Sequence, residues 1–380
     1  MSATVPGLAV TPEQVTADWL SEVLEAADCL HGARVIAVDL SAVGTGQMCD
    51  TIRATIRTDR DSPAPASLII KQPAADATSR QTAATLRSYE VEVRFYQELA
   101  ATLPVRSPVA YFAGFDEASG DFSLVLEDLA PAQQGDQLHG CSVVEARAAL
   151  DELVALHADR WGDASLESIE WLDRDHESQA AFLLDLLPAL WPGFLQRYDA
   201  LLPKEVRSAG QMLFGNLESY FGADSRPWTI VHGDFRLDNL LFDPRPGGRV
   251  AVVDWQLVSV GPAMNDVAYL LGAGLLPEER RLHEAALVRR YHDALQGAGV
   301  GGYDFASCWR DYRRGSFSGL IVAVAASMLV ERTARGDEMF LAMAERHARH
   351  ILDLDAGELL GAAGPIVDDD STGPNTEGTI

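Results

Sequence analysis

Polar residues that suit one kind of chemistry stand at fixed intervals in a short part of the chain. His232, Gly233 and Asp234 are consecutive, Asn239 follows Asp234 by five positions, and Asp254 follows Asn239 by fifteen. A carboxylate can accept or orient the proton of an attacking hydroxyl, and carboxylate and amide oxygens are ligands that Mg²⁺ prefers. Phosphoryl transfer needs this set because it depends mostly on positioning and charge neutralisation. We therefore predict Asp234 as the catalytic base, and Asn239 and Asp254 as metal ligands.

The segments around these residues indicate how they would be brought together. Strand-like residues at 239–242 and 250–253 flank the turn-rich sequence DPRPGG. Two short strands joined by this turn would place Asn239 and Asp254 close to each other.

The first 128 residues predict a sheet with one long helix. Strand patterns lie at 33–40, 51–58, 67–72, 109–115 and 122–126. Apolar residues recur at steps of three and four between 81 and 103, which is typical of one helix face, and Leu86 is among them. A leading helix is expected from the N-cap Thr11 to Ala27.

The remainder of the chain is predicted to be mainly helical. Ser142 and Glu145 form a capping-box signature at the start of the first helix. The expected helices are 142–161, 179–202, 204–221, 277–296, 304–329 and 337–354. We expect an N-terminal unit over 1–128, a C-terminal unit over 129–360 and a disordered tail over 361–380.

Composition narrows the classes of partner. The net charge of -26 repels phosphate backbones and anionic lipid surfaces, so we expect neither nucleic acid nor membrane as a partner. The four cysteines have no disulfide or zinc spacing, and the N-terminus lacks the features of a signal peptide, which fits the cytoplasm. The longest apolar run, 319–330, is too short to span a bilayer.

Two stretches resemble a known superfamily. HGDFRLDN and VVDWQ are similar to the catalytic loop and the metal-binding segment of the aminoglycoside phosphotransferase and choline kinase-like superfamily, the small-molecule relatives of protein kinases. Within it, the motifs look closest to ecdysteroid kinase-like bacterial phosphotransferases. The resemblance implies an α+β, bilobal, protein kinase-like fold with a five-stranded antiparallel sheet in the N-lobe and a mainly helical C-lobe. It also implies ATP or GTP as co-substrate and Mg²⁺ in the cleft.

Other kinase parts then appear in the expected order. Gly44, Gly46 and Gln47 lie in a loop whose amides would cradle phosphates, although such a glycine pair taken alone is better explained by a tight hairpin turn. Lys71 interrupts the apolar strand SLIIKQP. It is either a charged residue on an edge strand or the equivalent of the lysine that binds phosphates in kinases. Glu92 is its expected helix partner, unless it is a solvated helix residue.

The resemblance also assigns supporting residues. LVLEDL resembles the interlobe hinge, where backbone groups of Glu127 and Leu129 would bind the base, although an ordinary strand end has the same pattern. His157 and His232 are expected to support the site structurally rather than to transfer protons. Asp266 is either a helix-terminal residue or the brace of the catalytic loop.

The residues that would bind the phosphoryl acceptor are indicated less specifically by the sequence. Arg236 and Asp238 could either form a salt bridge or contact the substrate. Three further residues could either contact the substrate or belong to a solvated helix junction, namely Glu331, Arg335 and Asp337. The resemblance implies phosphoryl transfer to a hydroxyl of a small metabolite, natural product or antibiotic. The acidic chain favours cationic acceptors, while sterol-like alcohols and hydroxyacyl thioesters stay open. The alternative function is a catalytically silent nucleotide-binding protein with a regulatory or scaffold role.

Overall fold

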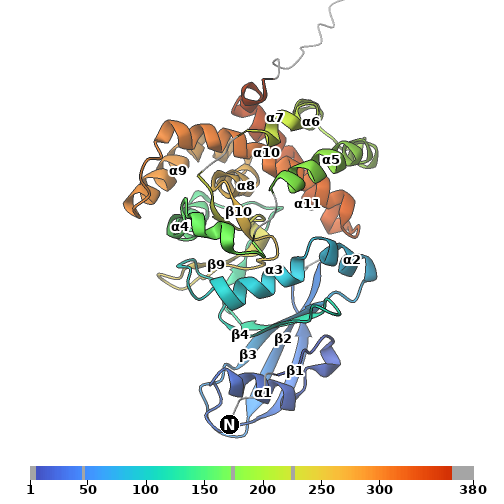
Figure 1. Ribbon diagram of the computed structural model, residues 1–380, viewed down its shortest axis with the longest axis vertical. Helices are drawn as coiled ribbons and strands as arrows, with labels where there is room; N and C mark the ends of the chain where they lie inside the picture. Colours follow the sequence, from blue (N-terminus) through green and yellow to red (C-terminus); the bar gives the residue numbers. More distant parts are fainter. Residues whose placement is uncertain (1–5, 45–47, 173–175, 224–226, 362–380) are drawn as a thin grey trace, which may run out of the picture.

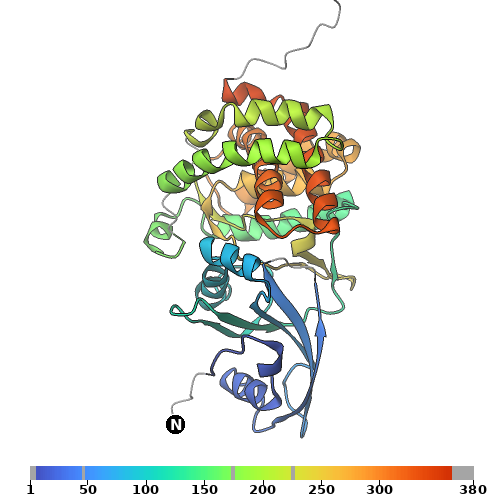
Figure 2. The same cartoon turned by 90° about the vertical axis from the view of Figure 1, so that its right-hand side faces the viewer.

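The computed structural model describes residues 6–44, 48–172, 176–223 and 227–361. Two parts are stacked along the long axis of the molecule (Figure 1), with the strands of the first third of the chain at one end and most of the helices at the other. The view turned by 90° shows the same division (Figure 2). Of the helices among these residues, none is long and apolar enough to cross a membrane.

The predicted five-stranded antiparallel sheet is confirmed. Its order is β1-β2-β3-β5-β4, and each strand begins and ends within two residues of the prediction. The strands are β1 (Val35–Ala42), β2 (Cys49–Thr58), β3 (Ser67–Pro73), β4 (Ala110–Phe115) and β5 (Phe122–Glu127). Because β3 pairs with β2 on one side and β5 on the other, Lys71 lies in the central strand, and the edge-strand interpretation is wrong.

The long helix predicted over 81–103 is broken. It consists of α2 (Ala77–Thr85), α3 (Ser88–Arg94) and a π-helical turn (Phe95–Leu99), and Arg87 between α2 and α3 is left-handed, with φ 55°. Leu86 is 37% exposed rather than buried. The break has a physical reason, since α2 buries only Ser79 and Ala83 and has no large apolar side chain to hold it in line with α3.

The leading helix is also shorter than predicted. Thr11 caps a short 3-10 turn over Pro12–Gln14. The α-helix α1 (Ala17–Ala26) starts later, and its N-cap is Thr16, whose side chain accepts a hydrogen bond from the Trp19 N–H. Thr11 is therefore an N-cap, as predicted, but the element that it begins is only one turn.

The C-terminal part is mainly helical, as predicted. Its helices are α4 (Val143–Asp159), α5 (His176–Tyr198), α6 (Lys204–Phe214), α7 (Leu217–Phe221), α8 (Met264–Gly274), α9 (Pro277–Gly297), α10 (Phe305–Leu329) and α11 (Ala334–Asp353). The predicted helix 204–221 is two helices, α6 and α7. Both halves of the Ser142–Glu145 capping box are formed at α4. The tail expected to be disordered lies outside the described residues from 362 onwards.

Five short strands lie among these helices. The predicted hairpin is β8 (Leu240–Phe242) paired with β9 (Val250–Val252), and β6 (Gln133–Gln134) extends it on the β8 side. A second pair, β7 (Thr229–Val231) with β10 (Ser259–Gly261), was not predicted. The predicted catalytic loop runs from β7 to β8, and the segment with Asp254 runs from β9 to β10. These pairings hold the two segments next to each other.

An aromatic contact links this region to the sheet-containing part. The fully buried Trp255 stacks on Phe95, with ring centroids 3.9 Å apart and planes 9° apart. Because Phe95 directly follows α3, this contact fixes α3 against the segment that contains Asp254.

Candidate active site

Lys71 lies at the centre of a buried ion cluster. Its Nζ donates to both carboxylate oxygens of Glu92, at 2.6 and 2.7 Å, and to Oδ1 of Asp254 at 2.9 Å. Lys71 is 7% exposed and Glu92 is 2% exposed. The central strand β3 and the buried face of α3 bring the first two residues together, and the turn after β9 brings the third. Glu92 is therefore not a solvated helix residue.

The charges of Lys71 and Asp254 stabilise each other, whereas burial raises the pKa of Glu92. Burial alone would lower the pKa of Lys71, but the carboxylates of Asp254 and Glu92 outweigh it and hold this pKa well above its ordinary value. Burial would raise the pKa of Asp254, but the Lys71 ammonium outweighs it and lowers this pKa. Lys71 is therefore a cation and Asp254 an anion at neutral pH.

Asp234 is buried beside this cluster and is held by three donors. Its Oδ1 accepts from the Tyr269 hydroxyl at 3.0 Å. Its Oδ2 accepts from Arg236 Nε at 3.0 Å and from Asn239 Nδ2 at 2.8 Å. Burial and the Asp234 carboxylate raise the pKa of Tyr269 well above its ordinary value, so this hydroxyl keeps its proton and donates. The carboxylate is thus fixed in one orientation.

Asp266 braces the backbone of the loop that carries Asp234. Its carboxylate accepts from the N–H groups of His232, at 2.7 Å, and Gly233, at 3.0 Å. It also lies 3.3 Å from His157 Nε2. Gly233 has φ 81°, and a Cβ there would lie 2.6 Å from the carbonyl oxygen of Leu257, so only glycine fits. The structure brings together the three residues expected to support the site.

His232 joins the loop to the segment with Asp254. Its Nδ1 accepts from the Asp234 N–H at 3.2 Å, so the ring proton lies on Nε2, which donates to the Val253 carbonyl at 3.0 Å. Asp254, the next residue, is left-handed with φ 67°. A non-glycine residue in this conformation carries backbone strain, which is common where a side chain must be aimed at a ligand.

The oxygen donors expected to bind a metal fit Mg²⁺. Asn239 uses its amide nitrogen for Asp234, so its amide oxygen is left for another partner. Asp254 is partly exposed, and its Oδ2 has only a long contact, 3.3 Å, with Gln256. Among the described residues there is no cluster of three His, Cys, Asp or Glu that could hold a metal. Two protein ligands are typical of Mg²⁺ sites that substrate phosphates complete.

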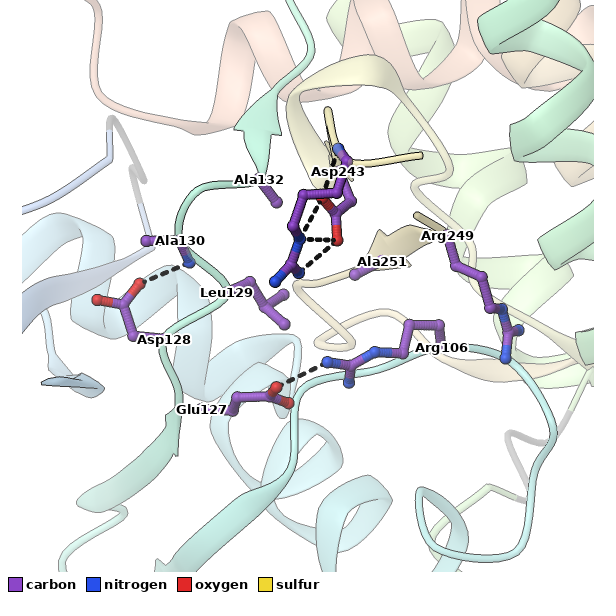
Figure 3. A pocket seen from close by; sticks show the side chains of 10 residues that line it. Arg106, Glu127, Asp128, Leu129, Ala130, Ala132, Asp243, Arg249 and Ala251 are labelled. Carbon is purple, nitrogen blue, oxygen red and sulfur yellow. Dashed lines mark hydrogen bonds and ion pairs between the residues drawn. The ribbon is translucent and has the colours of Figure 1, made fainter. Parts of the chain in front are cut away.

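The residues expected to contact a nucleotide lie at two places. Gly44, exposed and with φ 81°, lies two residues after the end of β1, whereas Gly46 and Gln47 lie outside the described residues. Glu127 and Leu129 line a polar pocket of about 210 Å³ between the end of β5 and the β8–β9 hairpin (Figure 3). The Glu127 carboxylate accepts from Arg106 Nη2 at 2.7 Å, so this side chain is already engaged.

The candidates for substrate contact fall into two groups. Arg236 bridges Asp234 and Asp238, donating to the latter at 2.7 Å, and Arg335 lies 3.7 Å from Asp238. Asp238 is only 6% exposed and also accepts from the Gln137 N–H at 2.9 Å, so it braces the loop.

The second group lies at and before the start of α11. Asp337 accepts from the Tyr198 hydroxyl and from Arg332 Nε, both at 2.7 Å. Glu331 is exposed. These contacts agree with a solvated helix junction at this point, and they do not bring either carboxylate to Asp234.

Comparison with known proteins identifies the family. A model described as the phosphotransferase enzyme family APH matches residues 64–305, which include every part of the site from Lys71 to Asp266. The chain belongs to this phosphotransferase family.

Solved structures show the same fold. Choline kinase from Cryptosporidium parvum Iowa II is 10% identical, with a TM-score of 0.51, over 84% of this chain and 89% of that one. APH(2")-IIIa, solved with GDP and kanamycin, is 13% identical with a TM-score of 0.50, over 85% of this chain and 94% of that one. At these identities the likeness shows the shared fold of the phosphotransferases.

Curated relatives match only in short segments. Acyl-CoA dehydrogenase family member 10 of Mus musculus is 53% identical over 49 residues, which are 13% of this chain and 5% of that protein. Acyl-CoA dehydrogenase family member 11 of Rattus norvegicus is 46% identical over 75 residues, 20% of this chain and 10% of that protein. The matches therefore cover a tenth or less of these relatives.

Tyr269 is the main site residue of this phosphotransferase that sequence reasoning missed. It follows Asp266 by three positions on α8, so both side chains reach the catalytic loop from one helix face, and this spacing was an available signal. Its ring stacks on His347 of α11, with centroids 5.4 Å apart and planes 7° apart. A Cβ on Gly319 of α10 would lie 2.1 Å from the His347 ring, so the imidazole fills space that a glycine leaves.

Proposed function

We propose that this phosphotransferase transfers the terminal phosphoryl group of ATP or GTP to a hydroxyl of a small molecule, with Mg²⁺. The observation that carries the proposal is the Lys71–Glu92–Asp254 cluster, held beside Asp234 and Asn239. Such a lysine positions nucleotide phosphates, and such a carboxylate serves the attacking hydroxyl. We place the nucleotide between the predicted units 1–128 and 129–360.

The acceptor hydroxyl oxygen attacks the γ-phosphorus, the bond from that phosphorus to the β–γ bridging oxygen breaks, and the nucleoside diphosphate leaves. Asp234 takes the hydroxyl proton. Asn239 and Asp254 would hold Mg²⁺, which when bound neutralises phosphate charge. Lys71, freed in part from Asp254, would bind a phosphate oxygen while Glu92 keeps it in place.

Further observations bear on the cellular compartment, the nucleotide and the acceptors to be tested. The four cysteines are free, which suits a reducing cytoplasm. The similar structure of APH(2")-IIIa was solved with GDP, so both purine nucleotides should be tried. The solved structures of choline kinase and of APH(2")-IIIa with kanamycin make choline and kanamycin acceptors to be tested. Hydroxyacyl-CoA thioesters should also be tested, because the short curated matches are to acyl-CoA dehydrogenase family members.

Replacing the proposed base tests the function. Asp234→Asn should lower turnover by about 10²- to 10⁴-fold, because proton transfer is lost while the shape is kept. Binding of Mg-ATP should persist and raise the melting temperature as in the wild type. The matched control is Asp61→Asn, at an exposed position remote from the site.

The measurement is nucleoside diphosphate release with the acceptor panel, and with water alone. Full activity of Asp234→Asn would refute the assignment. Stabilisation of the wild type by Mg-ATP without any turnover, including hydrolysis, would favour a silent nucleotide-binding protein.

A further inference from the structure

A second cavity, of about 310 Å³, lies in the helical part beside the catalytic loop. Gly233, next to the proposed base, and Tyr269, whose hydroxyl donates to Asp234, belong to its lining. The other lining residues come from α5, α7, α8, α10, β7 and β10, and from the segments directly beside α7, β7 and β10. The volume lies in the range of small-molecule sites. A hydroxyl at this end of the cavity would be close to the Asp234 carboxylate.

Most of this lining is apolar. It includes Leu183, Phe221, Val260, Pro262 and Val322, together with the ring of Tyr220. Ser259 and Asn265 are polar and half-buried. An apolar surface with a few polar groups is the usual composition of a site for a small organic molecule.

The charged groups in the lining already have protein partners. Asp266 is occupied by the backbone amides of the catalytic loop. Asp311 accepts from the Tyr303 hydroxyl at 3.0 Å. Arg314 donates to the carbonyls of Ser219 and Tyr220. The described part of the lining therefore offers no uncommitted carboxylate to a cation.

This pairing argues against an acceptor that carries several ammonium groups. Moving a charged group out of water is costly unless it is paired, and a polycation in this cavity would find no carboxylate that is not already in use. The net charge of -26 does not change this argument, since it describes the whole chain and not this lining. Apolar surface, in contrast, gains free energy on leaving water.

We propose that this cavity binds an uncharged, apolar body of the acceptor, so that the substrate is a hydroxylated aliphatic or ring compound whose hydroxyl faces Asp234. This inference rests on the proposed function, because it assigns the acceptor site of the same reaction. It reverses the expectation of a cationic acceptor that the acidic composition favoured.

A homologous series of 1-alkanols from butanol to octanol tests the inference on the wild-type chain. The KM for the alkanol, measured by ADP release with Mg-ATP, should fall about fourfold for each added methylene until the cavity is filled. Kanamycin and choline, assayed in parallel, should be poorer acceptors than octanol. A KM that does not change with chain length, or a better reaction with either cation, overturns the inference.

A charge placed in the cavity gives a second test. Val322→Asp should raise the KM for octanol at least tenfold and leave the KM for ATP unchanged, since residue 322 lines this cavity and not the pocket with Glu127 and Leu129. The matched control is Leu282→Asp on α9, a position that is 74% exposed, where neither KM should change. Equal KM values for octanol in wild type and Val322→Asp would contradict the assignment.

Failure of the inference can be told from failure of the proposed function. Slow hydrolysis of Mg-ATP that is lost in Asp234→Asn shows that the phosphotransferase machinery works without any acceptor. If this hydrolysis is present while the alkanols are inert, the apolar acceptor is wrong and the proposed function stands. If hydrolysis is absent, calorimetric binding of octanol to wild type and Val322→Asp still decides whether the cavity takes an apolar ligand.

Discussion

The buried cluster around Lys71 should respond unequally to the loss of its members. Lys71→Met leaves two carboxylates, whose side chains are 3% and 23% exposed, facing each other without a cation. Removing one partner of a buried ion pair costs about 3–5 kcal/mol. Glu92→Gln leaves Lys71 bound to Asp254, and the amide can still accept a hydrogen bond, so we expect a cost of about 1–3 kcal/mol.

The double variant is more informative than either single one. Lys71→Met with Glu92→Gln leaves one partly exposed carboxylate, so its cost should be smaller than the sum by about 1–3 kcal/mol. Urea unfolding followed by tryptophan fluorescence measures these values, and the buried Trp255 beside the cluster supplies part of the signal. Arg57→Met, at an exposed position of β2, is the control and should change stability by less than about 0.5 kcal/mol. Additive costs, or a Lys71→Met variant as stable as Glu92→Gln, would refute this electrostatic account.

Three further outcomes follow from the helices behind the base. Tyr269→Phe should lower kcat about tenfold and leave the KM for ATP unchanged, because only the hydrogen bond to Asp234 is lost. Steady-state kinetics measures both values, and an unchanged kcat would contradict a role of Tyr269 in positioning Asp234. Gly319→Ala should cost about 1–3 kcal/mol in urea unfolding, since its Cβ would overlap the His347 ring, whereas the control Gly297→Ala, with nothing within 4 Å, should cost nothing. Burial and the neighbouring positive charges hold the pKa of His347 well below 6.5, so its contribution to stability is present above about pH 6.5 and is lost as the pH falls, by up to about 1.4 kcal/mol per pH unit. His347→Phe should weaken this acid dependence in unfolding measured at pH 7.5, 6.5 and 5.5, and an unchanged dependence would exclude His347 as its source.

Much of the fold could be predicted because local patterns determined it. The five strands follow from runs of β-formers bounded by turn residues, and the helices α4, α9, α10 and α11 from apolar residues at helical spacing. The break at Arg87 could not be found in this way, because Leu86 continues the apolar pattern of α3 and only the packing of α2 decides that it is exposed. The β7–β10 pair was missed because three-residue strands carry almost no pattern.

In the site too, local sequence patterns reveal some contacts and not others. Lys71 and Glu92 could be paired from sequence because a lysine in an apolar strand needs a partner, and the structure brings them together. The contact of Tyr269 with Asp234 joins residues 35 positions apart, and no local rule fixes it. The apolar cavity is also a property of several elements together, which is why composition alone pointed to cationic acceptors.

The contacts of Asp266 with the loop backbone bear on how the acceptor preference of such an enzyme can be altered by substitution. Its carboxylate binds main-chain N–H groups, which all residues except proline possess, so it holds the shape of the catalytic loop without a hydrogen bond to any side chain of that loop. The residues that line the cavity, such as Leu183 and Val322, belong to other elements. Under the proposed function, acceptor preference can therefore be redesigned on α5 and α10 while the reacting groups stay in place, and we expect a library limited to these two helices to explore new substrates with little loss of catalytic geometry.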